Sequence, residues 1–191
     1  MTAVLDLDPS QVRSDPAAVV ADVHARLDVL AAPDRRTPNE HAATVVECDR
    51  AIRRLEALKL KLLAAADAAR VSDATGHTST GAWLAARTHA GGARCAREVR
   101  LAGALDTGLP ATSAALSSGA LSTEHASVIA DAIRTLPRLA PEQVTAVETR
   151  LVAKARTLDP QGLRRVARPR RCSRRPLIAS VGPLDVPGRS K

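Results

Sequence analysis

The sequence predicts an all-α protein, and three observations support this fold class. Alanine, leucine and mixed charges dominate the 191 residues, whereas Phe and Tyr are absent and Trp83 is the only aromatic residue; such a composition favours helices. Apolar residues recur at spacings of three and four along several segments. Proline follows a capping side chain or a loop at several points, as at the starts of helices. We expect a multi-helix bundle of about seven or eight helices with an aliphatic core.

The first element is predicted from Pro16, which follows the capping pair Ser14-Asp15. Its apolar residues keep helical spacing up to Ala32-Pro33, and a polar linker, DRRTPNE, follows. We assign residues 1–37 to this N-terminal helix and linker.

A long helix is predicted from Thr37-Pro38 to about Arg70. About 30 residues at 1.5 Å each make a helix of about 45 Å, longer than is usual in a globular protein. Such length favours a coiled-coil-like partner, and we expect a homodimer through this helix. We expect Cys48 to be a small core residue. The predicted apolar stripe consists of Val45, Cys48, Ile52, Leu55, Leu58, Leu62 and Ala66.

Shorter helices are predicted along the rest of the chain. A turn cluster, SDATGHTST, precedes short helices over residues 81–88, 92–105 and 111–117. Ser122 caps a helix that runs to Ile133, Pro141-Glu142 begins another, and Asp159-Pro160 opens the last. Residues 38–168 form the predicted helical domain. At Pro169 the helical period ends, and residues 169–191 are predicted to be a disordered tail rich in Arg and Pro.

The net charge of +8 resides in the C-terminal end. Nine of the 28 basic residues but only one acidic residue, Asp185, lie within residues 164–191, so the remainder of the chain is neutral. This end has two interpretations: sequence-independent binding of nucleic acid through counterion release, or solvated arginines without a role.

Other features restrict the class of protein. No apolar run approaches the ~20 residues that span a bilayer, and the acidic N-terminus does not resemble a signal peptide, so we expect no membrane association. Three widely spaced cysteines favour neither a disulfide framework nor a zinc site. We expect a cytoplasmic protein with no cofactor or metal. Phosphate-loop and dinucleotide motifs are absent.

The segment around Trp83 has two interpretations. In a helix-turn-helix, Leu84 and Ala85 would pack inward, the break would fall at residues 88–91, and Cys95 and Val99 would face the first helix. Arginines three residues apart on the second helix suit phosphates or guanine edges. The alternative is the ordinary packing of two bundle helices around Trp83. The candidate DNA-binding residues are Arg87, Arg94, Arg97, Arg100, Arg164, Arg165 and Arg168.

Five stretches in order carry a resemblance to a known family: LEALKLKLLAAADAA (55–69), GHTSTGAWLAART (76–88), VRLAGAL (99–105), LPATSAALSSGALSTEHASVIADAI (109–133) and ARTLDPQGLRRVAR (155–168). They resemble the domain of unknown function that precedes HNH endonuclease domains in actinobacterial proteins, the 13E12-repeat family. His89 departs from this pattern, which favours glycine in the turn; a left-handed residue there costs more for a non-glycine.

The resemblance implies an all-α accessory region in front of a metal-dependent nuclease. That nuclease needs paired histidines and an asparagine around its metal. This sequence has no clustered histidines, and its only asparagine is Asn39. We expect a truncated or frameshifted copy, which the other downstream reading frames would test. His77 and His125 match the family pattern; each is interpreted either as a general base or ligand, or as a capping or core histidine.

We therefore expect a non-catalytic portion of an HNH-endonuclease-like protein that serves as a DNA-binding or accessory module. The alternative is a helical protein–protein interaction bundle without a nucleic-acid role.

Overall fold

The computed structural model describes residues 15–29, 37–136 and 140–168, and all regular structure in these ranges is α-helical. The predicted all-α fold class is therefore confirmed. The chain divides into two compact units, residues 1–45 and 46–191. Residues 34–36 of the predicted linker DRRTPNE and the predicted tail, residues 169–191, lie outside the described residues, whereas residues 38–40 of that linker belong to the long helix.

The first unit contains α1 (Pro16–Asp28) and the start of the long helix α2 (Pro38–Ala68). Asp15 caps α1 by accepting a hydrogen bond from the backbone N–H of Ala17 at 3.1 Å. At the start of α2, the Thr37 backbone N–H donates to Glu40 Oε2 at 2.7 Å, which is half of a capping box. Both starts fall where the capping residues and prolines predict them.

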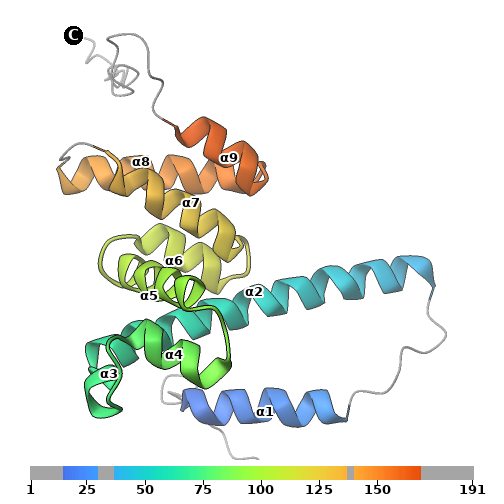
Figure 1. Ribbon diagram of the computed structural model, residues 1–191. Coiled ribbons are helices and arrows are strands. Elements are labelled where there is room, and N and C mark those ends of the chain that lie inside the picture. The colour runs from blue at the N-terminus through green and yellow to red at the C-terminus, as the bar shows by residue number, and fades with distance from the viewer. Residues whose placement is uncertain (1–14, 30–36, 137–139, 169–191) are drawn as a thin grey trace, which may run out of the picture. The chain divides into compact units, whose positions relative to one another are not determined.

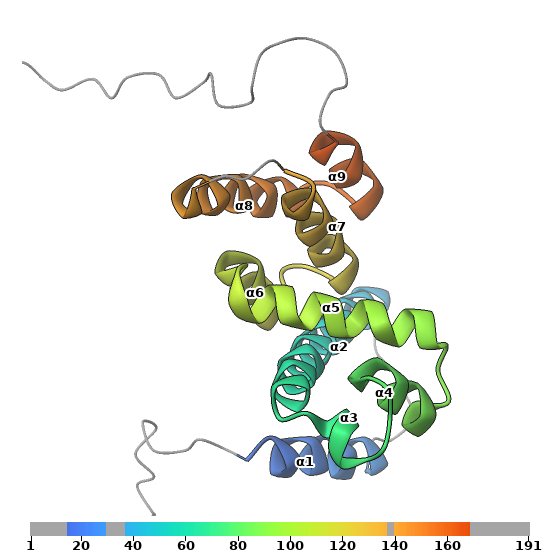
Figure 2. The same cartoon turned by 60° about the vertical axis from the view of Figure 1, so that its left-hand side comes forward.

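The second unit contains the remainder of α2 and the seven helices that follow it in the described residues. Figure 1 shows α5 and α6 between the C-terminal part of α2 with α4 on one side, and α7 to α9 on the other; Figure 2 shows the same order from another direction. The helices are α3 (Val71–Ala74), α4 (Thr80–Thr88), α5 (Gly92–Thr107), α6 (Pro110–Ser117), α7 (Thr123–Arg134), α8 (Pro141–Ala155) and α9 (Pro160–Ala167).

Local capping explains why most of these bounds could be predicted. Ser122 accepts a hydrogen bond from the backbone at the start of α7, and Asp159 accepts one from Gly162 at the start of α9. The sequence predicts only a turn where the one-turn helix α3 lies. This helix follows Arg70, which takes the left-handed conformation with φ 54° and redirects the chain after α2.

The core of the second unit is aliphatic, as the composition predicts. Leu116, Leu121, Ile129 and Leu163 are at most 1% exposed. They lie in α6, the loop before α7, α7 and α9, so the core joins helices that are far apart in the sequence. Burying such side chains contributes about 1.5–3 kcal/mol each.

The predicted apolar stripe of α2 is only partly correct. The residues of α2 that are buried are Ala57, Leu60 and Leu63, whereas Val45, Ile52, Leu55 and Leu62 are 39–68% exposed. The prediction that Cys48 is a core residue is wrong, because it is exposed. Two faces of α2 carry apolar residues, and the helical period alone does not reveal which face the other helices cover. No helix within the described ranges is both long and apolar enough for a membrane span.

Candidate functional site

The α4–turn–α5 segment has the local architecture that the sequence predicts. Ser79 caps α4 by accepting a hydrogen bond from the Ala82 N–H at 3.1 Å. His89 ends α4 in the left-handed conformation, with φ 53°, and α5 begins at Gly92 after a turn of three residues. Histidine tolerates this conformation better than most non-glycine residues. The turn length is that of a helix-turn-helix.

The two helices cross closely at Gly81. This residue is buried, and a Cβ atom there would lie 3.1 Å from the Cα of Ala96 on α5. Leu84 of α4 and Cys95 of α5 are both buried. Thr80 donates a hydrogen bond of 2.6 Å to Asp67 Oδ1, which ties the start of α4 to the end of α2. The crossing therefore requires small residues and is held in place by α2.

Trp83 packs against the core. It is half-buried, as is Ala85, and both contact the core cluster of the second unit. This position fits the interpretation in which two bundle helices pack around Trp83. Val99 is also half-buried, and the predicted inward position of Cys95 is correct, with 1% exposure.

Arg94 is paired with an acidic side chain of its own helix. Its Nε atom lies 3.0 Å from Glu98 Oε1, and Lys59 Nζ on α2 lies 2.5 Å from Glu98 Oε2. Burial alone raises the pKa of Glu98, but the hydrogen bonds and charges of Lys59 and Arg94 outweigh burial, so the pKa lies below its ordinary value. Glu98 therefore neutralises part of the positive charge on this side of α5.

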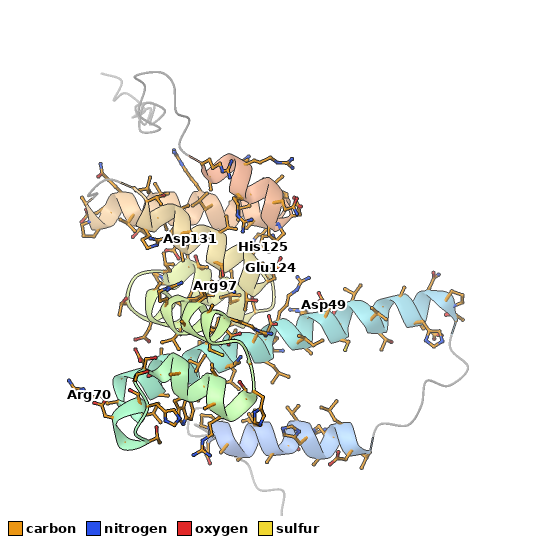
Figure 3. All side chains as sticks on the ribbon, in the orientation of Figure 1. Asp49, Arg70, Arg97, Glu124, His125 and Asp131 are labelled. Carbon is orange, nitrogen blue, oxygen red and sulfur yellow. The ribbon has the colours of Figure 1, made fainter. Side chains whose placement is uncertain are left out.

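Arg97 and Arg100 lie in a different environment. Both are exposed, and within the described residues neither has an ion-pair or hydrogen-bond partner. They line a cleft of about 750 Å³ between α5 and α7, with Val144 of α8 also in its lining. Figure 3 labels Arg97 on α5 and Asp131 on α7, the two helices that form the walls of this α5–α7 cleft. The predicted row of three arginines is thus divided.

Arg134 and Asp131 of α7 also line the α5–α7 cleft, and the sequence does not single them out. Arg134 Nη2 lies 3.1 Å from Asp131 Oδ1, and both side chains are about three-quarters exposed, at 75% and 72%. They are three residues apart near the end of a short helix, which gives no signal in the sequence. Only the packing of α7 beside α5 brings Arg134 into one cleft with Arg97 and Arg100.

The lining of the α5–α7 cleft combines aliphatic side chains with basic ones. Thr107 and Ser127 also line it. Three guanidinium groups and one carboxylate leave a net positive charge, so the chemistry of the cleft favours an anion. The aliphatic residues of the lining are Leu101, Ala104, Leu109, Ala130, Ile133 and Val144.

The other predicted DNA-binding residues do not line this cleft. Arg87 is exposed in the last turn of α4. Arg164 and Arg165 are exposed in the last turn of α9, and Arg168 is the exposed C-cap of that helix. Arg164, Arg165 and Arg168 form a separate basic end of the described chain.

The candidate histidines are held by hydrogen bonds at helix ends. His125 Nε2 lies 2.9 Å from the carbonyl oxygen of Leu158, and its Nδ1 lies 2.8 Å from Ser122 Oγ. The carbonyl can only accept, so Nε2 carries a proton and donates to it. His77 Nδ1 lies 3.0 Å from Thr75 Oγ1 in the turn after α3. These contacts favour the capping and packing interpretation of both residues.

Glu148 is a buried carboxylate that the sequence pattern does not reveal. It lies on α8 and is fully buried; its Oε1 accepts hydrogen bonds from Thr112 N at 2.7 Å and Thr112 Oγ1 at 2.8 Å. Thr112 is in the first turn of α6, whose N-cap residue, Leu109, makes no side-chain cap. Glu148 therefore caps α6 from another helix. Nothing in the sequence around a glutamate on a polar-looking helix indicates this role.

A second groove, of about 730 Å³, lies between α2, α5 and α6. Small and apolar residues make up most of its lining, and two charged residues, Lys61 and Asp106, also line it. In the ranges that the structure describes, no three His, Cys, Asp or Glu side chains gather as metal ligands would.

Residues 42–174 match the family model described as Domain of unknown function (DUF222). This match covers α3 to α9 and most of α2, and it includes both walls of the α5–α7 cleft. Neither the curated proteins nor the solved structures gave a match.

Proposed function

From the premise that this chain belongs to the DUF222 family, we propose that it is a DNA-binding accessory module that contacts duplex DNA through α5. The observation that carries this proposal is the pair of exposed guanidinium groups, Arg97 and Arg100, without protein partners in the described part of the chain. Arginines without an internal acceptor, on an exposed helix face, are suited to phosphate oxygens and guanine edges.

The surroundings of these arginines support the same function. The α4–turn–α5 segment has the length of a helix-turn-helix, and the Gly81–Ala96 crossing fixes the angle between its helices. On α5, Ala93 is exposed, so no bulky side chain at this position keeps the start of the helix away from DNA. Glu98 is engaged by Arg94 and Lys59 and leaves Arg97 and Arg100 uncompensated.

The proposed context is an HNH-endonuclease-like protein. The resemblance of five stretches of this chain to the region that precedes such nucleases supports this context. In this proposal the module binds DNA and performs no chemistry; a nuclease domain would cut the DNA that the module holds. The basic end formed by Arg164, Arg165 and Arg168 would add sequence-independent contacts to phosphates.

Fluorescence anisotropy with a labelled duplex tests the proposal. We expect Arg97→Gln/Arg100→Gln to weaken binding about tenfold or more and to lower the salt slope, because two cationic contacts to phosphate are lost. The control, Arg150→Gln/Arg156→Gln, removes the same charge from exposed positions on α8 and at its C-cap. Equal losses in the two double variants would reject α5 as the contact surface.

A second candidate function is a protein–protein interaction bundle, and the exposed apolar face of α2 favours it. Ile52, Leu55 and Leu62 are 51%, 39% and 40% exposed, and their spacings of three and seven fit a helical partner, including α2 of a second copy. Light scattering during size-exclusion chromatography tests the homodimer. A concentration-independent monomer whose mass is unchanged in Leu55→Gln would reject it.

A further inference from the structure

We propose that the α5–α7 cleft binds one backbone phosphate of DNA between Arg97, Arg100 and Arg134, and that Asp131 weakens this binding in the wild-type protein. This inference rests on the proposed function and extends it from one helix to two. It assigns a ligand-binding role to Arg134 and a restraining role to Asp131.

The position of Arg134 supports its part in the site. It lines the same cleft as Arg97 and Arg100 but comes from the other wall, α7. Three guanidinium groups from two walls can surround a tetrahedral phosphate, whereas a single helix face presents them from one side only. Arginine has the planar fork that binds phosphate through two hydrogen bonds.

The ion pair between Arg134 and Asp131 can exchange for a phosphate. The Arg134 side chain is 75% exposed and that of Asp131 is 72% exposed, with 3.1 Å between Nη2 and Oδ1. Solvent screens such a pair, so it holds Arg134 weakly. A phosphate that enters the α5–α7 cleft would meet the other two arginines at once, and Arg134 could leave Asp131 to join them.

Asp131 opposes the anion in two ways. Its carboxylate lines the cleft and repels a phosphate there, and it also occupies the guanidinium of Arg134. Removing this charge should therefore raise affinity for DNA, an effect that damage to the fold would not produce. Asp106 provides a matched comparison, because it is exposed on α5 but lines the groove between α2, α5 and α6 instead.

The test measures duplex binding by anisotropy over a salt series, using the full chain and four single variants whose thermal unfolding is checked by circular dichroism. We expect Asp131→Asn to tighten binding about threefold or more, and Asp106→Asn to change it much less. We expect Arg134→Gln to weaken binding several-fold and to lower the salt slope by less than one, because Arg97 and Arg100 still contact the same phosphate; Arg150→Gln should have a smaller effect.

Four results would overturn the inference. Equal tightening by Asp131→Asn and Asp106→Asn would mean that only net charge matters, and equal weakening by Arg134→Gln and Arg150→Gln would remove Arg134 from the site. If inorganic phosphate binds in an Arg134-dependent manner while the duplex does not bind, the cleft takes free phosphate instead. Loss of binding in Arg97→Gln/Arg100→Gln with no effect of Arg134→Gln would leave the proposed function standing and reject only the cleft.

Discussion

At the scale of single residues, Glu148 shows how a buried polar side chain is retained for structural reasons. Its Oε1 satisfies both the backbone N–H and the hydroxyl of Thr112, while its Oε2 is buried without a hydrogen-bond partner in the described residues. A buried polar group needs such partners because losing them costs about 1–3 kcal/mol per group. These hydrogen bonds stabilise the first turn of α6, where the N-cap residue, Leu109, supplies no side-chain acceptor.

We therefore expect Glu148→Ala to lower the free energy of unfolding by about 2–4 kcal/mol, because the two donors of Thr112 lose their acceptor. Glu148→Gln should cost less than half as much, because its amide oxygen can still accept. Urea denaturation followed by circular dichroism measures both values. A glutamine variant less stable than the alanine variant would contradict this account of the cap.

The lowered pKa of Glu98 predicts that the free energy of unfolding depends on pH. Its pKa in the folded protein lies below the ordinary value of 4.5, because Lys59 and Arg94 outweigh the effect of burial. A depressed pKa gives stability that is present above the unfolded pKa and is lost as the pH falls through the folded pKa.

We expect the free energy of unfolding to fall as the pH drops below the ordinary glutamate pKa of 4.5, and to fall less steeply in Glu98→Gln. Urea denaturation at each pH measures the slope. Asp106→Asn is the control, since no ion pair of Asp106 is present in the described residues. An unchanged slope in Glu98→Gln would show that the contacts with Lys59 and Arg94 do not persist in solution.

At the scale of secondary-structure elements, the sequence predicts where helices begin better than what they contact. Asp15, Ser122 and Asp159 cap the helices that follow them, because capping depends only on neighbours in the chain. The buried face of α2 depends instead on helices far along the sequence, and there the predicted stripe from Val45 to Leu62 is largely wrong. Local chemistry can be read from the sequence, and tertiary contact cannot.

The α4–α5 crossing gives a prediction for this scale. Gly81→Ala places a Cβ 3.1 Å from the Ala96 backbone, so we expect a loss of about 1–3 kcal/mol in stability and weaker DNA binding. Gly103→Ala, also on α5, meets no atom within 4 Å; we expect it to stabilise the protein by about 0.5–1 kcal/mol and to leave binding unchanged. Thermal unfolding and anisotropy measure the two effects. Equal effects of the two changes would contradict a tight crossing.

At the scale of the whole molecule, the candidate site is only half visible in the sequence. Arg97 and Arg100 can be predicted because they share one helix with a regular spacing. Arg134 and Asp131 lie more than thirty residues away, and only the fold places α7 beside α5. Arg94 is predicted with the other two, but it is held by Glu98, whose neighbour Lys59 comes from α2.

The distribution of charge raises the question of which part of the molecule binds DNA. The excess charge of +8 lies within the last 28 residues, whereas the proposed surface lies on α5 and α7. A basic C-terminal end binds nucleic acid through counterion release alone, with a steep dependence on salt. Binding by the full chain would therefore not by itself support the helical surface.

Whether α5 contacts DNA is decided by the anisotropy of a labelled duplex over a salt series, measured with the full chain and with residues 1–168. We predict that both bind, and that Arg97→Gln weakens binding of the shorter chain. If only the full chain binds, with a steep salt slope that Arg97→Gln leaves unchanged, the C-terminal end alone is the contact and α5 is an ordinary helix of the bundle.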